Sequence, residues 1–139
     1  RDVFGYGMWK DYILMRLGET YLLRAEARFK QNNFDGAADD INELRNRAHA
    51  ATVDATDITL DFILDERVRE LIGEENRRMT LVRTGTLVER ARRLNGTGPL
   101  AGGNIETTNG LQDYHMLLPI PQSEIDLNKD AVLEQNPGY

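Results

Sequence analysis

The stretch from Leu60 to Gly85 constrains the fold more than any other part of this chain. Its apolar residues recur at steps of three and four, the spacing that places side chains on one face of an α-helix. They are Leu60, Ile63, Leu64, Val68, Leu71 and Ile72. Thr59 stands where an N-cap residue belongs, and Asp61 falls in the first turn, where the helix dipole favours a carboxylate. We therefore predict an amphipathic helix over residues 60–83, against which the rest of the chain packs.

The other face of this predicted helix is rich in charges of both signs. They are Asp65, Glu66, Arg67, Arg69, Glu70, Glu74, Glu75, Arg77 and Arg78. Oppositely charged residues three or four positions apart, such as Glu66 and Arg69, form exposed pairs worth about 0.2–0.5 kcal/mol each. Arginines surrounded by carboxylates have their donors engaged, so we predict a structural ladder of ion pairs and not a phosphate-binding surface.

Length and composition limit the number of domains and the classes of partner that the chain can have. The 139 residues, of which 40% are hydrophobic and 29% charged, suffice for one hydrophobic core, and we predict a single domain over residues 1–139. A net charge of -6 argues against nucleic acid or anionic lipid as the main partner. No apolar run reaches the length of a membrane span. The absence of cysteine excludes a disulfide framework and cysteine-ligated zinc within this sequence.

Two helices are predicted ahead of the central stretch, over residues 16–31 and 34–48. The first has two apolar stripes, which is typical of a helix sandwiched between neighbours. The stripes are Leu17, Tyr21, Leu22, Ala25 and Phe29, and Leu23 with Ala27. Asn32 and Asn33 end the first helix and cap the second, which predicts an antiparallel hairpin. Its turn, residues 33–37, is similar to that of a tetratricopeptide repeat, and one such hairpin needs further helices to pack against.

The second half of the chain contains fewer regular elements. We predict a short basic helix over residues 86–94 and a long loop over residues 95–113. The loop is rich in glycine, but it lacks the flanking strand, helix and lysine of a phosphate-binding loop. Residues 114–120 are predicted to be extended because Pro119 and Pro121 disfavour a helix. One helical turn is predicted at residues 122–127, followed by an extended tail.

No catalytic or metal-binding pattern is present. His49 and His115 each lack a metal-ligand partner at helical spacing. The adjacent carboxylates at residues 39–40 and 74–75 point in different directions around a helix, so they do not form an acid–base pair. The sequence contains no Gly-x-Ser-x-Gly motif. We predict that the chain is not an enzyme and needs no cofactor or metal.

Three segments of the chain resemble the C-terminal part of the SusD/RagB family of outer-membrane nutrient-binding lipoproteins. The first comprises RLGE at 16–19, LLRAEA at 22–27 and INELRNRA at 41–48. The second comprises DER at 65–67, REL at 69–71, Glu74, Arg77 and LVRTG at 81–85. The third comprises LPIPQSEI at 118–125 and QNPGY at 135–139. Their order and spacing span nearly the whole chain.

The resemblance implies a mainly α fold. A tetratricopeptide-like hairpin would pack on further helices, with a long loop and an extended proline-containing tail. The resemblance also implies a location at the cell outer membrane, on the surface-exposed or periplasmic side. A lipid anchor and a signal sequence, neither of which is in this chain, would bring the protein there. The resemblance further implies a partnership with a SusC-like TonB-dependent transporter and an oligosaccharide or polysaccharide ligand. Because the chain begins at Arg1 and not at Met, we expect it either to start within a larger protein or to be a processed chain.

Ligand-binding residues vary within the family, so none transfers by position. The candidates in this chain are Trp9 and Tyr6, whose rings can stack on a sugar or, for Trp9, fill a core or an interface. The alternative function is a helical-hairpin module that binds another protein and no sugar. An exposed Trp9 beside the loop of residues 95–113 would favour sugar binding. An apolar groove along residues 17–29 would favour a helical or peptide partner.

Overall fold

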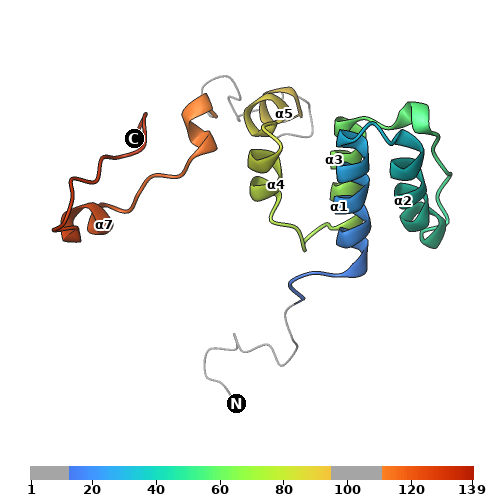
Figure 1. Cartoon of the computed structure of the whole chain (residues 1–139), viewed down its shortest axis with the longest axis horizontal. Coiled ribbons are helices and arrows are strands. Elements are labelled where there is room, and N and C mark those ends of the chain that lie inside the picture. The colour runs from blue at the N-terminus through green and yellow to red at the C-terminus, as the bar shows by residue number, and fades with distance from the viewer. Residues whose placement is uncertain (1–12, 95–110) are drawn as a thin grey trace, which may run out of the picture. The chain divides into compact units, whose positions relative to one another are not determined.

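The computed structural model describes residues 13–94 and 111–139, which form six α-helices, two short 3-10 helices and no strand (Figure 1). The α-helices are α1 (Leu17–Lys30), α2 (Phe34–Arg47), α3 (Leu60–Glu70), α4 (Arg77–Arg83), α5 (Leu87–Leu94) and α7 (Gln122–Leu127). The 3-10 helices are η1 (Ala55–Asp57) and η2 (Asp113–Met116). The prediction of a mainly α fold is confirmed for these residues. Two compact units make up the chain, with the boundary between Glu75 and Asn76; a single domain over residues 1–139 stays a prediction.

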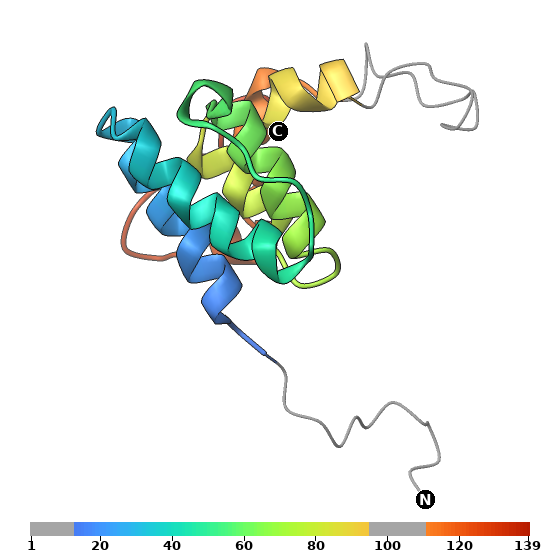
Figure 2. The same ribbon diagram turned by 90° about the vertical axis from the view of Figure 1, so that its right-hand side faces the viewer.

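In the first unit, α1 packs against both α2 and α3 (Figures 1 and 2). The core between these helices contains Leu22, Ala25, Ala37, Ile41 and Ile63, all of them inaccessible to solvent. The alanines on α1 and α2 let the two helices approach closely. The first predicted stripe supplies Leu22 and Ala25 to this core, whereas on the second stripe Leu23 is only half-buried and Ala27 is exposed. Leu17, predicted on the first stripe, is instead 68% exposed because it opens α1 at one end of the bundle.

The turn between α1 and α2 has the conformation that its asparagines predict. Asn32 adopts a left-handed conformation with φ of 60°. The Asn33 side chain accepts a hydrogen bond from the Gly36 amide at 3.0 Å and so caps α2. Arg28 on α1 donates to the Gly36 carbonyl at 2.7 Å, which ties the hairpin across its turn. The hairpin is confirmed, and its likeness to a tetratricopeptide repeat stays a prediction.

The prediction of one continuous helix over residues 60–83 is wrong. Thr59 caps α3 as predicted, accepting from the Phe62 amide at 3.0 Å, but α3 ends at Glu70. Gly73 then adopts a φ of +77°, a conformation that interrupts a helix, and the Asn76 side chain caps the start of α4. Ile72, predicted on the buried face, is 80% exposed because it lies in this interruption.

The charged face of α3 is also different from the predicted solvent-exposed ladder. Glu66 is 6% exposed and Arg67 is 1% exposed, because α1 and α2 both pack against α3 and cover this flank. The predicted pair of Glu66 with Arg69 is present at 2.7 Å. Glu66 also binds Arg45 of α2 at 3.0 Å, so its contacts join two helices. These ion pairs therefore connect the packed helices, and they are partly buried.

In the second unit, α5 packs against α4 and η2. Arg78 of α4 donates to the backbone carbonyls of His115, at 2.5 Å, and Leu117, at 3.3 Å, which holds this segment in place. The extended segment predicted over residues 114–120 is wrong at its start, since residues 114–116 belong to η2. The local 3-10 turn forms because the Gln112 amide donates to His115 Nδ1 at 2.7 Å. The helical turn predicted at residues 122–127 is confirmed as α7.

Side chains of the C-terminal tail hold it against the segment ahead of α7. Gln135 accepts from the Ile120 amide at 2.7 Å and donates to the Ile120 carbonyl at 2.8 Å. Tyr139 donates to the Leu117 carbonyl at 3.0 Å, and its ring meets that of Tyr114 edge to face. The tail is therefore held by side-chain contacts to the backbone of residues 117–120 and not by backbone pairing of two strands. In the described part of the chain, no helix has both the length and the apolar character needed to cross a bilayer.

Candidate functional site

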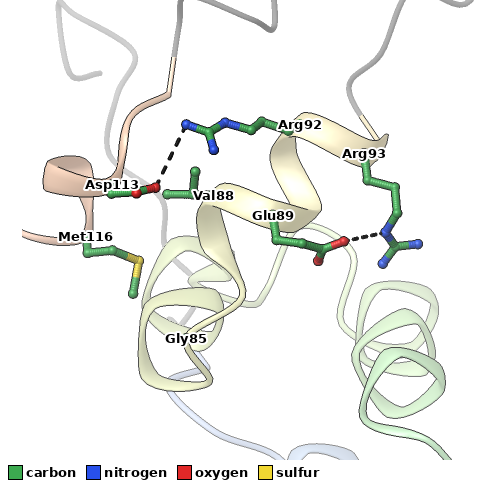
Figure 3. A pocket seen from close by; sticks show the side chains of 7 residues that line it. All are labelled: Gly85, Val88, Glu89, Arg92, Arg93, Asp113 and Met116. Carbon is green, nitrogen blue, oxygen red and sulfur yellow. Dashed lines mark hydrogen bonds and ion pairs between the residues drawn. The ribbon is translucent and has the colours of Figure 1, made fainter.

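A pocket in the second unit is the candidate site (Figure 3). It is open to solvent, has a volume of about 680 Å³, and lies between α5 and η2. Its lining residues are Gly85, Val88, Glu89, Arg92, Arg93, Asp113 and Met116. Such a volume is typical of sites for small ligands.

Helical spacing positions most of the lining residues. Val88 and Arg92 lie four residues apart on α5 and so project from the same side of the helix, as do Glu89 and Arg93. Gly85, with φ of +71°, ends α4 and turns the chain into α5. The remaining two side chains come from η2, which returns to α5 after residues that lie outside the described ranges.

Arg92 connects the two sides of the pocket. Its Nη2 donates to the Leu111 carbonyl at 3.2 Å and lies 3.5 Å from Oε1 of Gln112. The same nitrogen is 3.8 Å from Oδ1 of Asp113, which is an ion pair but too long for a direct hydrogen bond. The Asp113 side chain is 90% exposed, so its oxygens remain accessible to a ligand. Arg93 is engaged differently, because its Nε donates to Glu89 at 2.7 Å.

The pocket combines an apolar floor with a polar rim. The floor is formed by Val88, which is buried, and Met116. The rim has two arginines and two carboxylates, so its formal charges cancel. The described lining residues include no serine, cysteine, histidine or lysine. This arrangement can bind and orient a ligand.

Two residues that the sequence analysis considered and rejected as catalytic or metal-binding groups, His115 and Asp40, have structural contacts. His115 accepts the Gln112 amide and packs beside Tyr114 and Tyr139. Asp40 is buried and binds Arg24 at 2.6 Å and Arg28 at 2.9 Å. Among the residues that the structure describes, no group of three His, Cys, Asp or Glu side chains is placed to hold a metal ion.

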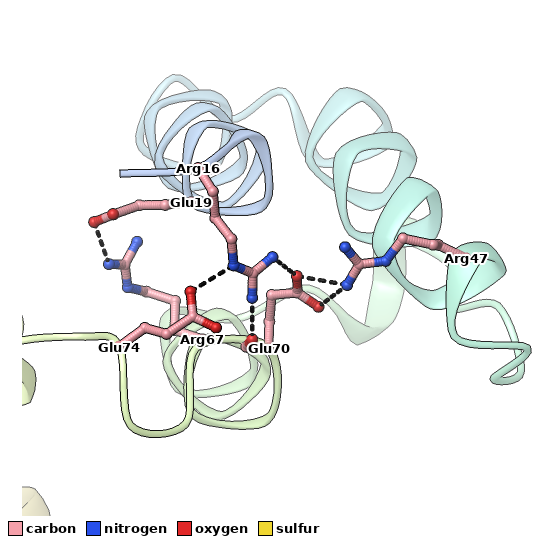
Figure 4. A network of polar contacts seen from close by, with 6 residues as sticks. All are labelled: Arg16, Glu19, Arg47, Arg67, Glu70 and Glu74. Carbon is pink, nitrogen blue, oxygen red and sulfur yellow. Dashed lines mark hydrogen bonds and ion pairs between the residues drawn. The ribbon is translucent and has the colours of Figure 1, made fainter. Parts of the chain in front are cut away.

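A network of ion pairs in the first unit joins α1, α2 and the end of α3 (Figure 4). Arg16 donates to the carboxylate and the backbone carbonyl of Glu70, and its Nε donates to Glu74 at 2.5 Å. Arg47 of α2 contacts both carboxylate oxygens of Glu70 at 2.6 Å. Glu70 is therefore shared by two arginines, one preceding α1 and one on α2. The network fixes the helices relative to one another.

Arg67 is the buried member of this network. Its Nε donates to Glu75 at 2.6 Å, and its Nη2 donates to Glu19 of α1 at 3.2 Å. The third nitrogen, Nη1, is buried and has no hydrogen-bond partner among the described residues. The guanidinium is thus held by two carboxylates within the bundle, a structural role that requires its charge to stay compensated.

The ion pairs change the pKa of Glu74. The hydrogen bond from Arg16 is the main cause and lowers the pKa of Glu74 below its usual value. The same hydrogen bond, together with that to Glu70, raises the pKa of Arg16. A carboxylate with a lowered pKa in the folded state stabilises the fold above its unfolded pKa, about 4.3 for glutamate, and this contribution is lost as the pH falls through the folded value.

We therefore predict that Glu74→Gln destabilises the chain at pH 7, and that the difference from the wild type shrinks as the pH falls below about 4.3. Urea unfolding at several pH values, followed by far-UV circular dichroism, measures this difference. Asp39→Asn, which removes an exposed carboxylate from α2, controls for the loss of one negative charge. A difference that grows as the pH falls below this value would contradict the assignment.

The two ligand-binding residues predicted from the sequence, Trp9 and Tyr6, lie outside the described residues. The pocket was not predicted from the sequence. The i,i+4 spacing of Val88 with Arg92 and of Glu89 with Arg93 was a signal for the helical side of the pocket. No local pattern in the sequence indicated that Asp113 would lie beside these residues of α5.

A profile of the SusD family matches residues 5–139. The chain belongs to the SusD family. This membership confirms the resemblance found in the sequence. Proteins of the family are non-catalytic binding proteins and surface lipoproteins of the outer membrane.

Two curated members and one solved structure show how far the similarity extends. The chain is 37% identical over 129 residues to the starch-binding protein SusD of Bacteroides thetaiotaomicron, covering 93% of this chain and 22% of that protein. It is 35% identical over 136 residues to a SusD-like protein of Formosa agariphila, covering 91% of this chain and 24% of the relative. The fold is similar to that of BT4246, with a TM-score of 0.69 at 24% identity, covering 96% of this chain and 24% of that structure. The chain therefore spans about a quarter of the length of these relatives.

Proposed function

We infer that the protein is a non-catalytic glycan-binding component of an outer-membrane nutrient uptake system. The observation that carries this proposal is family membership together with 37% identity to a starch-binding relative over 93% of the chain. The open pocket between α5 and η2, with hydrogen-bonding groups around an apolar floor, agrees with a binding role. In this proposal, residues 1–139 form the C-terminal portion of a SusD-like protein.

The proposed location and transporter partner rest on the family alone. The protein would be a lipid-anchored protein of the outer membrane and would work with a SusC-like TonB-dependent transporter. Tyr6 and Trp9 are proposed to stack on the apolar face of a sugar ring, since aromatic rings bury area while leaving the hydroxyls free to form hydrogen bonds.

Calorimetric titration of the intact polypeptide that carries this chain tests the proposal. The probes are maltoheptaose, cellohexaose and xylohexaose as neutral oligosaccharides, and tetragalacturonic acid as an acidic one. We expect saturable binding of at least one probe. Trp9→Ala is expected to weaken that binding by about tenfold if its ring stacks on the sugar, since stacking contacts of this kind are worth about 1 kcal/mol or more. An intact polypeptide that binds none of the probes would overturn the proposal.

The second candidate function is a protein-interaction module without sugar binding. Four neighbouring apolar residues at the start of α1 favour it, because all are exposed: Ile13, Leu14, Met15 and Leu17. A surface of this kind is typical of protein interfaces. Affinity purification of the intact polypeptide from membranes of its own host distinguishes the two. Leu14→Glu should release a protein partner without changing the affinity for an oligosaccharide.

A further inference from the structure

We propose that the pocket between α5 and η2 binds a neutral saccharide, and that Arg92 and Asp113 recognise two neighbouring hydroxyls of one sugar ring. The proposal rests on the glycan-binding function inferred above and adds to it a site and a ligand class. It differs from the predicted contribution of Tyr6 and Trp9, since every residue involved comes from α5 or η2.

The shape of the pocket suits a single sugar unit within a longer chain. A volume of about 680 Å³ accommodates a pyranose ring, and the opening to solvent leaves room for the glycan to continue outside the pocket. Val88 and Met116 supply a small apolar surface against which the C–H face of a sugar can lie. An open site of this kind suits recognition of one unit in a polymer, where the ends of the ligand are not enclosed.

The polar rim has donors and acceptors that no described residue engages. Within the described residues, the contacts of Arg92 all involve Nη2, so Nε and Nη1 are available to donate. Asp113 is only loosely paired with it at 3.8 Å and is 90% exposed, so its oxygens are available to accept. One sugar hydroxyl can accept from Arg92 while its neighbour donates to Asp113. Hydrogen bonds to charged groups are the stronger ones in such sites.

Charge balance selects a neutral ligand over an acidic one. Glu89 compensates Arg93 through a 2.7 Å contact, and Asp113 compensates Arg92. A uronic acid or sulfated sugar would meet both carboxylates and would gain no uncompensated arginine in return. A neutral sugar meets a rim whose formal charge is zero and whose groups can all form hydrogen bonds.

The test measures Kd by calorimetry for the intact polypeptide with maltoheptaose, cellohexaose, xylohexaose and tetragalacturonic acid. Asp113→Ala is expected to weaken binding of the neutral probe by about tenfold or more, the effect of losing one hydrogen bond to a charged group. Glu134→Ala, which removes an exposed carboxylate from the tail of the same unit, is the matched control and should leave Kd unchanged. Because Asp113 is on the surface, its removal should not prevent folding, and circular dichroism verifies this.

Asp113→Arg provides a second readout with the opposite sign. It gives the rim a net positive charge, so we expect it to lose the neutral probe and to gain affinity for tetragalacturonic acid. A neutral probe that binds the wild type and Asp113→Ala equally well would overturn the pocket proposal and leave the glycan-binding function standing. A wild type that prefers tetragalacturonic acid would overturn the ligand class. A wild type that binds no probe would overturn both proposals.

Discussion

Replacing Arg67 by methionine is expected to destabilise the chain by about 3–5 kcal/mol, the typical effect of removing one partner from a buried ion pair. Arg67 is 1% exposed, and the side chain of Glu75, which it binds at 2.6 Å, is 5% exposed. Without the guanidinium, this carboxyl group loses its 2.6 Å partner in a site with little water. The free energy of urea unfolding of the 139-residue chain, followed by far-UV circular dichroism, gives the difference.

Arg69→Met is the matched control for this prediction. Arg69 lies on the same helix and also pairs with a glutamate, Glu66, at 2.7 Å, but its side chain is 58% exposed. We expect it to change the stability by less than about 1 kcal/mol. The double variant Arg67→Met, Glu75→Leu should recover part of the loss, because it also removes the buried carboxylate that Arg67 binds. Equal effects of the two single arginine variants would show that burial of Arg67 has no energetic consequence.

Leu22→Ala is expected to destabilise the chain by about 2–5 kcal/mol, because it leaves a cavity at the centre of the helical core. Leu22 is inaccessible to solvent and belongs to the same core cluster as Ile41 of α2 and Ile63 of α3. The magnitude depends on how far these neighbours relax into the space. The same unfolding measurement determines it.

Leu17→Ala makes the identical chemical change on the same helix at a position that is 68% exposed. Its effect should stay within about 0.5 kcal/mol, because the leucine buries little surface and alanine favours a helix. A loss as large as that of Leu22→Ala would mean that the start of α1 is covered in solution. That outcome would contradict the exposure of Leu17.

Local signals predicted the helical hairpin well. Asn32 and Asn33 act through their own backbone conformation and side chains, and Thr59 caps the helix that follows it directly. Such features depend on a few consecutive residues, so a single sequence contains the necessary information. The family resemblance, carried by motifs along the whole chain, was likewise recognisable from the sequence and is confirmed.

Features that depend on contacts between distant residues were not predicted. Charged residues continue after Leu71 with the same spacing as on α3, so the sequence suggested that the helix also continued. Gly73 and Asn76 instead end α3 and start α4. Helical periodicity places Arg67 on a polar flank, and only the packing of α1 and α2 on α3 buries it. The pocket requires Asp113 to meet α5 across a segment whose path no local pattern specifies.

The contact of Arg92 with the Leu111 carbonyl has a consequence for how this protein can be altered. The chain leaves α5 at Leu94 and is fixed again at Leu111, so both ends of the intervening segment are anchored by the same helix. The entropy of closing a loop changes only slowly with its length once its ends are anchored. Sequences of different length and composition can therefore be grafted between these two points without unfolding α5 or η2.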